Sequence, residues 1–183
     1  RKVVKPPVQG MGTFGQYMVA RAMAERGIKI ALSGEGSDEL FGGYARTLLA
    51  AGEPLPDGYE HYEAPADYPD NLHDALQYDL DRLPDLLAVD DQMTGAFGIE
   101  ARAPFTDPRI VEYGLSLPDT ERVGKRHRRQ AVRGIVPNAI IDRTDKMGFP
   151  APLVLWAQEE PVRSFVADRI GYVPDVSKPF DRG

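Results

Sequence analysis

Hydroxyls, glycines and carboxylates are concentrated in one short segment, Leu32–Tyr44, which reads Leu-Ser-Gly-Glu-Gly-Ser-Asp-Glu-Leu-Phe-Gly-Gly-Tyr. Gly34 and Gly36 leave room for backbone N–H groups to approach a phosphate or a nucleotide closely. Asp38 offers carboxylate oxygens, which Mg2+ combines with substrate oxygens, and Glu35 is then free to act as a base. Taken alone, the segment supports a second interpretation equally well, in which the glycines only make a turn and the carboxylates only complement a helix dipole.

The elements on either side of this segment place it where ligands are commonly bound. Apolar residues alternate from Ile28 to Leu32, which predicts a short strand, and a helical pattern follows the loop to about Ala51. Thr13 is a candidate cap for an earlier helix that ends at Gly27. Ligands of parallel sheets collect outside the carboxyl ends of the strands, so a strand, loop and helix in this order favour a binding site.

The rest of the chain reads mainly as helix. Residues 52–70 contain four prolines, three tyrosines and six acidic residues without a clear period, so we expect a loop or insertion there without chemistry. Further helices are predicted from Asn71 through Leu83, around Asp90 to Phe97, from Asp107 to Leu115, from Lys125 to Ile135, from Pro137 to Arg143, around Trp156 and from Val162 to Ile170. Residues 171–183 are expected to be loosely held.

Composition bounds the class of protein. The chain has 183 residues, of which 42% are hydrophobic, enough for one core and one domain. Its net charge of -6 disfavours binding to DNA or RNA. The absence of cysteine excludes disulfides and cysteine nucleophiles within the chain, and no apolar run approaches the ~20 residues that span a bilayer. We therefore expect a soluble, cytoplasmic protein that binds neither nucleic acid nor membrane.

Three ordered blocks of the sequence resemble the asparagine synthetase family. The segment Leu32–Tyr44 is similar to the family signature nearly letter for letter, and Asp90–Asp107, with its Glu-Ala-Arg-Ala-Pro-Phe-Thr-Asp ending, resembles a second family block. The third block is made by Lys125, Arg129, Pro137, Arg143 and the run Lys146-Met-Gly-Phe149. Together the blocks span Leu32 to about Trp156.

The resemblance implies the fold and the activity. It implies an α/β fold that is the C-terminal portion of a pyrophosphate-loop (adenine nucleotide α-hydrolase-like) domain and is predominantly helical in the part present. Residues 1–183 would be a partial synthetase domain, because the Ser-Gly-Gly-x-Asp-Ser pyrophosphate loop and the cysteine of the glutaminase domain are not in this sequence. Family members use ATP and Mg2+ to convert a carboxylate, here aspartate, to an acyl-adenylate with release of pyrophosphate, and ammonia from glutamine then displaces AMP.

The same resemblance assigns roles to individual residues. Lys146 would stabilise the charge that develops on the α-phosphate and pyrophosphate, although a lone lysine is also compatible with a solvated surface position. Glu100 would be a second acidic residue at the reacting centre, or alternatively the partner of Arg102 in a buried ion pair. The remaining assignments are Glu35 beside the acyl-adenylate, Asp38 as the Mg2+ ligand, and Ser33, Gly34, Gly36 and Ser37 as contacts of ATP. The basic run from Lys125 to Arg129 faces either pyrophosphate or solvent.

Two departures from the family pattern keep other functions open. Gln92 stands where arginine is usual and Gly95 where methionine is common, which bears on the choice of substrate. The alternatives are a non-catalytic or split family member that binds nucleotide or a partner, and a related amide ligase of secondary metabolism with another carboxylate acceptor. The expected partners are a small-molecule carboxylate, ammonia or an amine, a glutaminase domain or N-terminal half, and a second copy of the chain in a homo-oligomer.

Overall fold

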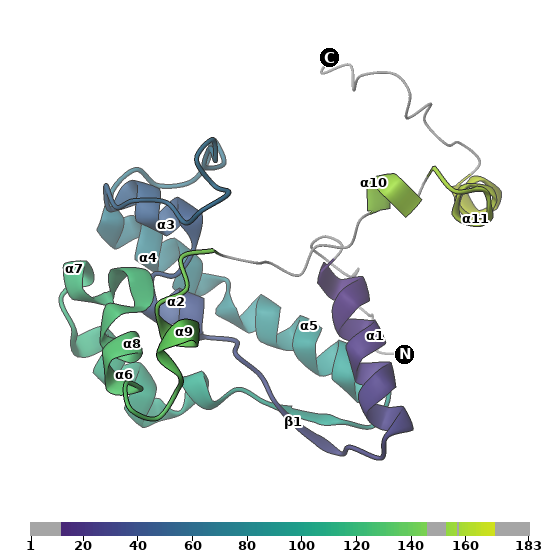
Figure 1. Cartoon of the computed structure of the whole chain (residues 1–183), viewed down its shortest axis with the longest axis horizontal. Helices are drawn as coiled ribbons and strands as arrows, with labels where there is room; N and C mark the ends of the chain where they lie inside the picture. The colour runs from purple at the N-terminus through teal and green to yellow at the C-terminus, as the bar shows by residue number, and fades with distance from the viewer. Residues whose placement is uncertain (1–11, 146–152, 157, 171–183) are drawn as a thin grey trace.

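The computed structural model consists mainly of short helices together with a small parallel sheet (Figure 1). The structure describes residues 12–145, 153–156 and 158–170. The α-helices are α1 (Gly12–Glu25), α2 (Ser37–Phe41), α3 (Ala45–Ala50), α4 (Leu72–Asp81), α5 (Leu83–Gly95), α6 (Pro108–Ser116), α7 (Asp119–Arg122), α8 (Arg126–Ala131), α9 (Asn138–Ile141), α10 (Leu153–Trp156) and α11 (Glu160–Ile170). Two 3-10 turns, η1 (Pro104–Thr106) and η2 (Val123–Lys125), complete the regular structure. The expected predominance of helix in an α/β fold is confirmed.

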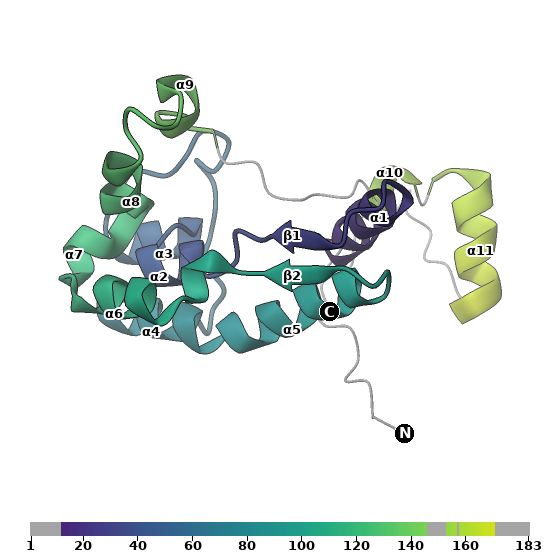
Figure 2. The same ribbon diagram turned by 90° about the horizontal axis from the view of Figure 1, so that it is seen from below.

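The sheet consists of β1 (Ile30–Leu32) and β2 (Glu100–Arg102), which run parallel with Ile30 opposite Glu100 (Figure 2). The pairing continues past β1, because the Ser33 N–H donates to the Arg102 carbonyl at 2.7 Å. Helix α1 packs on α5, and the ring of Tyr17 lies 4.8 Å from that of Phe97, just after the end of α5. The two strands therefore end side by side, and the chain after each strand enters the same region.

Helices α2, α4 and the turn η2 enclose the best-packed part of the molecule. Leu40 and Leu76 are at most 1% exposed, as is Val123. The buried Arg122 crosses this region and donates from Nε to the Leu40 carbonyl at 3.1 Å. A helix of only five residues is too short to be stable alone, so these tertiary contacts hold α2 in place.

Several sequence predictions hold because local signals were strong. The Asn71 side chain accepts from the Asp74 N–H at 3.0 Å and begins α4, and Asp107 with Pro108 begins α6 in the same manner. Residues 52–70 contain no helix. The expectation for residues 171–183 lies outside the described part of the chain.

Other predictions need correction. The helix expected from the loop to about Ala51 is two helices, because Gly42 adopts φ 53° and its backbone lies against Val123. Helix α5 begins at Leu83 rather than near Asp90. Residues 100–102 form the second strand, although Glu-Ala-Arg has little strand character of its own.

Within the described residues, no helix combines the length and apolar character that crossing a membrane requires.

Candidate functional site

The segment Ser33–Ser37, here called the glycine loop, makes a tight turn from β1 into the start of α2. The Glu35 N–H donates to the Ser33 hydroxyl at 3.1 Å, and the Ser37 N–H donates to the Gly34 carbonyl at 3.3 Å. Gly36 adopts φ 91°, a left-handed conformation that favours glycine, and a Cβ there would lie 3.2 Å from that of Phe105. The buried Ser37 hydroxyl has no hydrogen-bond partner among the described residues. The loop thus brings the four predicted ATP contacts together in one turn.

Asp38 follows the loop and forms an ion pair with Lys125 of η2, at 2.8 Å between Oδ2 and Nζ. Both side chains are mostly buried, with 26% of Asp38 and 16% of Lys125 exposed. Gly43 lies so close to the pair that a Cβ there would approach Lys125 Cε to 2.0 Å and Asp38 Oδ1 to 2.1 Å. Lys125 itself has φ 58°, so its backbone takes an uncommon conformation to bring the ammonium to Asp38.

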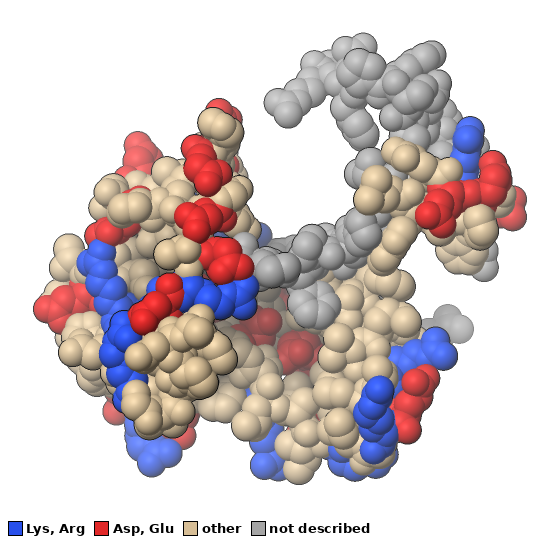
Figure 3. Space-filling view, in the orientation of Figure 1, with Lys and Arg blue, Asp and Glu red and all other residues tan. Residues whose placement is uncertain are grey.

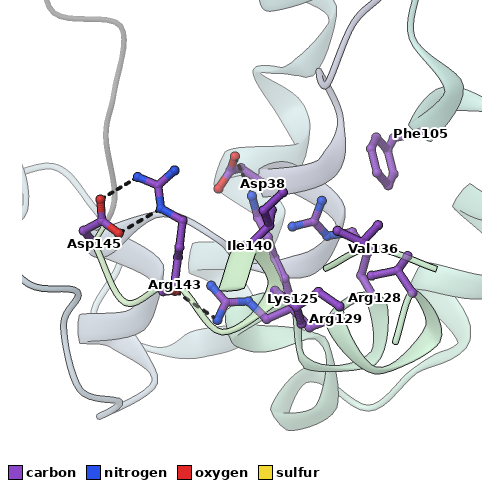
Figure 4. Close-up of a pocket in the computed structure, with 11 residues that line it drawn as sticks. Asp38, Phe105, Lys125, Arg128, Arg129, Val136, Ile140, Arg143 and Asp145 are labelled. Carbon is purple, nitrogen blue, oxygen red and sulfur yellow. Dashed lines mark hydrogen bonds and ion pairs between the residues drawn. The ribbon is translucent and has the colours of Figure 1, made fainter. Parts of the chain in front are cut away.

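A cavity of about 570 Å³ lies beside this ion pair (Figure 4). Its basic wall consists of four cationic side chains from η2, α8 and the segment after α9: Lys125, Arg128, Arg129 and Arg143. Among the predicted site residues that the structure describes, only Asp38 lines the cavity. The apolar side of the cavity is formed by Val132, Val136, Ile140 and Ile141. Four cations beside a mostly apolar surface favour an anionic ligand of the size of pyrophosphate or larger.

Two of the cations in the basic wall, Arg128 and Arg143, differ in their protein partners. Arg128 Nε is buried without a hydrogen-bond partner in the described part of the chain, and the guanidinium lies 5.7 Å from the Phe105 ring centre. Burial lowers the pKa of Arg128, Asp38 raises it and the neighbouring Arg129 lowers it. Arg143 pairs with Asp145, and both of these side chains are 49% exposed. Figure 3 shows basic and acidic side chains interspersed along the part of the molecule that carries α7, α8 and α9.

Glu35 lies in an environment that favours its protonated form. Partial burial is the first cause of its raised pKa, followed by the negative charges of Glu39, Asp90 and Asp38. A carboxyl group with a raised pKa accepts a proton more readily near neutral pH, which suits a general base. Asp90 was not singled out from the sequence. It lies one helical turn before Thr94, whose hydroxyl donates to the Asp90 carbonyl at 2.7 Å.

The other predicted catalytic residues lie elsewhere or outside the described part. Glu100 begins β2, is exposed, and pairs with Arg102 at 2.9 Å, which lowers the pKa of Glu100. The ion pair considered for these two residues therefore exists, but it is exposed rather than buried. The charges that raise the pKa of Glu35 are those of Glu39, Asp90 and Asp38, and not that of Glu100. Lys146 lies outside the described residues, although Asp145 immediately before it lines the cavity.

The basic run from Lys125 to Arg129 divides between the two interpretations given to it. Lys125, Arg128 and Arg129 line the cavity. Arg126 turns to Glu53 and His127 pairs with Glu121 at 2.8 Å. The basic run therefore supplies both one side of the cavity and an outer surface of α8, because neighbouring residues of a helix point in different directions.

The residues around Asp38 fit a Mg2+ ion that takes most of its oxygen ligands from a bound phosphate compound and water. Mg2+ is commonly bound by one or two protein carboxylates together with phosphate and water oxygens. Among the described residues there is no cluster of three or more histidine, aspartate or glutamate side chains that could hold a metal on their own. Asp38 can supply one oxygen ligand from the cavity wall, provided that Lys125 is displaced or shares the carboxylate.

The fold and this site define an α/β domain with a glycine-rich turn after a parallel strand and an adjoining cationic cavity. Comparison with known proteins then identifies the group. The sequence model of the family described as asparagine synthase matches residues 3–57 and 50–177, and this chain belongs to that family. The family assignment made from the three sequence blocks is thereby confirmed.

Individual relatives agree with the family match. The chain is 30% identical over 159 residues to asparagine synthetase [glutamine-hydrolyzing] 1 of Saccharomyces cerevisiae, covering 85% of this chain and 24% of the yeast protein. It is 37% identical over 102 residues to a putative asparagine synthetase [glutamine-hydrolyzing] 1 of Methanocaldococcus jannaschii, covering 56% of this chain and 17% of that protein. It is also 27% identical over 225 positions to asparagine synthetase [glutamine-hydrolyzing] 1 of Bacillus subtilis, covering 84% of this chain and 35% of the relative.

These alignments also show how much of a relative the chain represents. It spans about a quarter of the length of the yeast protein and about a third of the Bacillus protein. The Bacillus alignment is longer than the chain itself, so that relative carries residues between the matched segments that have no counterpart here.

Proposed function

We propose that this chain is the carboxyl-terminal part of a pyrophosphate-loop synthetase domain that forms an amide at the expense of ATP. The main support for this proposal is the cavity, in which Asp38 faces the basic wall of Lys125, Arg128, Arg129 and Arg143. A carboxylate that can bind Mg2+ opposite several cations suits the polyphosphate of ATP and its pyrophosphate product. The acceptor would be aspartate and the nitrogen donor ammonia derived from glutamine, as the names of the relatives suggest for those proteins.

The first half of the proposed reaction forms an acyl-adenylate. The aspartate side-chain carboxylate attacks the α-phosphorus of ATP, an acyl-phosphate bond forms, and the bond to pyrophosphate breaks. The basic wall would offset the charge that accumulates on the departing pyrophosphate. Mg2+ would neutralise part of the phosphate charge. Asp38 would hold it with phosphate oxygens, while Ser33, Gly34, Gly36 and Ser37 would orient the nucleotide.

The second half replaces AMP by nitrogen. Ammonia attacks the acyl carbon, and Glu35 would take the proton that the nitrogen loses as AMP departs. The raised pKa of Glu35 supports this role, because its carboxylate is a stronger base than an exposed glutamate. Lys146 is proposed to stabilise the α-phosphate, and Glu100 to act as a second acidic group. A glutaminase domain and the segment that carries the pyrophosphate loop are the proposed partners.

The test is exchange of labelled pyrophosphate into ATP by the complete product of the gene, with Mg2+ and one carboxylate at a time. We expect exchange with aspartate. We also expect Arg128→Gln to weaken pyrophosphate binding about tenfold, because it removes a charge-assisted contact from the cavity. Arg133→Gln is the matched control, because Arg133 is exposed, pairs with Asp142 and does not line the cavity.

Each outcome of this experiment separates the candidate functions. Exchange that depends on another carboxylate would make the protein an amide ligase with a different acceptor, for which the changes at Gln92 and Gly95 would matter. Pyrophosphate binding without exchange would support a non-catalytic relative. Absence of both binding and exchange, or equal binding by the Arg128 and Arg133 variants, would refute the proposed use of the cavity.

A further inference from the structure

Glu39 is the most deeply buried acidic residue next to the glycine loop, with 1% of its surface exposed. One carboxylate oxygen, Oε2, accepts a hydrogen bond from the Gly36 N–H at 3.0 Å. The other oxygen, Oε1, accepts a short hydrogen bond from the Tyr44 hydroxyl. A buried carboxylate is costly unless its oxygens are hydrogen-bonded, so these two contacts explain how Glu39 is tolerated inside the molecule.

The contact with Gly36 acts directly on the shape of the loop. Glu39 is the third residue of α2 and reaches back to the N–H of the residue before the helix, as in a capping box. That residue is Gly36, whose φ of 91° sets the direction of the turn between Glu35 and Ser37. Fixing the Gly36 N–H therefore also fixes where the backbone of Glu35 enters the site.

Tyr44 holds the other side of Glu39 and remains a hydrogen-bond donor. Its pKa is raised above the ordinary value of 10, first by burial and then by its hydrogen bond to Glu39. The phenol consequently keeps its proton at neutral pH and can donate to Glu39. The Arg46 guanidinium lies over the Tyr44 ring at 4.1 Å from its centre, which restrains the ring from its opposite side.

Arg46 is in turn anchored to the core. Its Nε lies 2.8 Å from Oδ1 of Asp79, whose side chain is completely buried in α4. Oδ2 of Asp79 accepts from the Thr47 hydroxyl at 2.6 Å and from the Tyr68 hydroxyl at 2.9 Å. Tyr68 belongs to the segment 52–70, which was expected to carry no chemistry, and it is 7% exposed. A continuous set of buried and half-buried contacts therefore connects α4 with the glycine loop.

We propose that Glu39 is a positioning residue that fixes the Glu35–Gly36 turn, with Tyr44 holding the Glu39 carboxylate in place. Arg46, which is held by Asp79, supports Tyr44 from the core. The effect of the turn on substrate binding rests on the proposed function, whereas the effect on loop geometry does not.

The first test measures the hydrogen exchange of the Gly36 amide in the complete product of the gene by NMR. Tyr44→Phe removes one hydroxyl and keeps the ring under Arg46, so the variant should fold. Loss of this one hydrogen bond should speed exchange of the Gly36 amide by about tenfold. Tyr68→Phe is the matched control, because it removes a hydroxyl at the other end of the contacts. It should lower the urea midpoint and leave Gly36 exchange within about twofold of wild type, relative to global unfolding.

The second test measures Mg·ATP affinity of the same three proteins by calorimetry. Tyr44→Phe should weaken binding about fivefold to tenfold, and Tyr68→Phe should leave it unchanged. Gly36 exchange that is as slow in Tyr44→Phe as in wild type would overturn the positioning role. A wild-type gene product that binds neither Mg·ATP nor pyrophosphate would argue against the proposed function, while the exchange result would still decide the role of Glu39.

Discussion

The glycine loop and the basic wall border one site, but different kinds of contact hold them. Ser37 and Glu39 at the loop are at most 3% exposed and are fixed by backbone and buried carboxylate contacts. At the Arg143 end of the basic wall the contact is instead an exposed ion pair with Asp145, in which both side chains are 49% exposed. Buried contacts set a geometry before any ligand arrives, whereas exposed ion pairs contribute little and exchange partners easily. The loop is therefore preorganised, and the Arg143 end of the wall can adapt to an anion.

The largest expected effect on stability comes from Asp79→Ala. This substitution removes the buried carboxylate that holds Arg46, which in turn contacts Tyr44. It leaves Arg46, Thr47 and Tyr68 without their shared acceptor. Loss of one partner from such a buried pair should lower the free energy of unfolding by about 3 kcal/mol. Urea denaturation followed by circular dichroism measures this change.

The matched control for Asp79→Ala is Asp142→Ala. Asp142 pairs with Arg133 at the surface, where the two side chains are 53% and 49% exposed. We expect no measurable change in unfolding free energy from this substitution, because solvent screens the pair. Equal losses in the two variants would remove the distinction between a buried anchor and a surface ion pair.

A smaller effect is expected from Gly43→Ala, at the point where loop and wall meet. The new Cβ would lie 2.0 Å from Lys125 Cε and 2.1 Å from Asp38 Oδ1, so the ion pair has to separate. Overpacking of this kind should cost about 1–3 kcal/mol of unfolding free energy. Gly95→Ala is the control, because no atom lies within 4 Å of the added Cβ. Gly95 is the last residue of helix α5. That variant should be as stable as wild type or slightly more stable.

The smallest effect concerns the pH dependence of stability at Glu35. Its pKa is raised in the folded chain above the ordinary value of 4.5, so folding favours the protonated form. The resulting stability is fully present below about pH 4.5 and is lost as pH rises through the folded pKa. Glu35→Gln should therefore be more stable than wild type near pH 8 and no more stable near pH 4.

Glu100→Gln provides the comparison of opposite sign in the same denaturation series. Arg102 lowers the pKa of Glu100, so its contribution is present above pH 4.5 and is lost as pH falls through the folded pKa. Parallel pH profiles for the two variants would contradict the different environments of these two glutamates.

The sequence predicts the elements whose signals are local. Asn71 and Asp107 mark the starts of α4 and α6 because each cap acts within three residues of itself. The glycine loop was also recognised, since its residue types and the strand before it are adjacent in the chain. The family resemblance added roles for Glu35 and Asp38 that residue types alone left undecided.

Features that depend on distant partners were missed. The break at Gly42 depends on Val123, and the strand at residues 100–102 exists only because β1 lies beside it. The burial of Tyr68 depends on Asp79, and the effect of Asp90 on Glu35 depends on how α5 packs. A periodicity analysis reads neighbours along the chain, so none of these pairings leaves a signal that it can detect.

The open side of β1 has a practical consequence for anyone who purifies this chain. In the described part of the structure β1 pairs only with β2, and Ile30 and Leu32 are 50% and 75% exposed. An unpaired strand edge with apolar side chains can recruit a strand from another molecule. The net charge of -6 opposes such association and is most effective at low ionic strength. Dilute, low-salt buffers should therefore preserve the chain in solution better than the concentrated, high-salt conditions that favour precipitation.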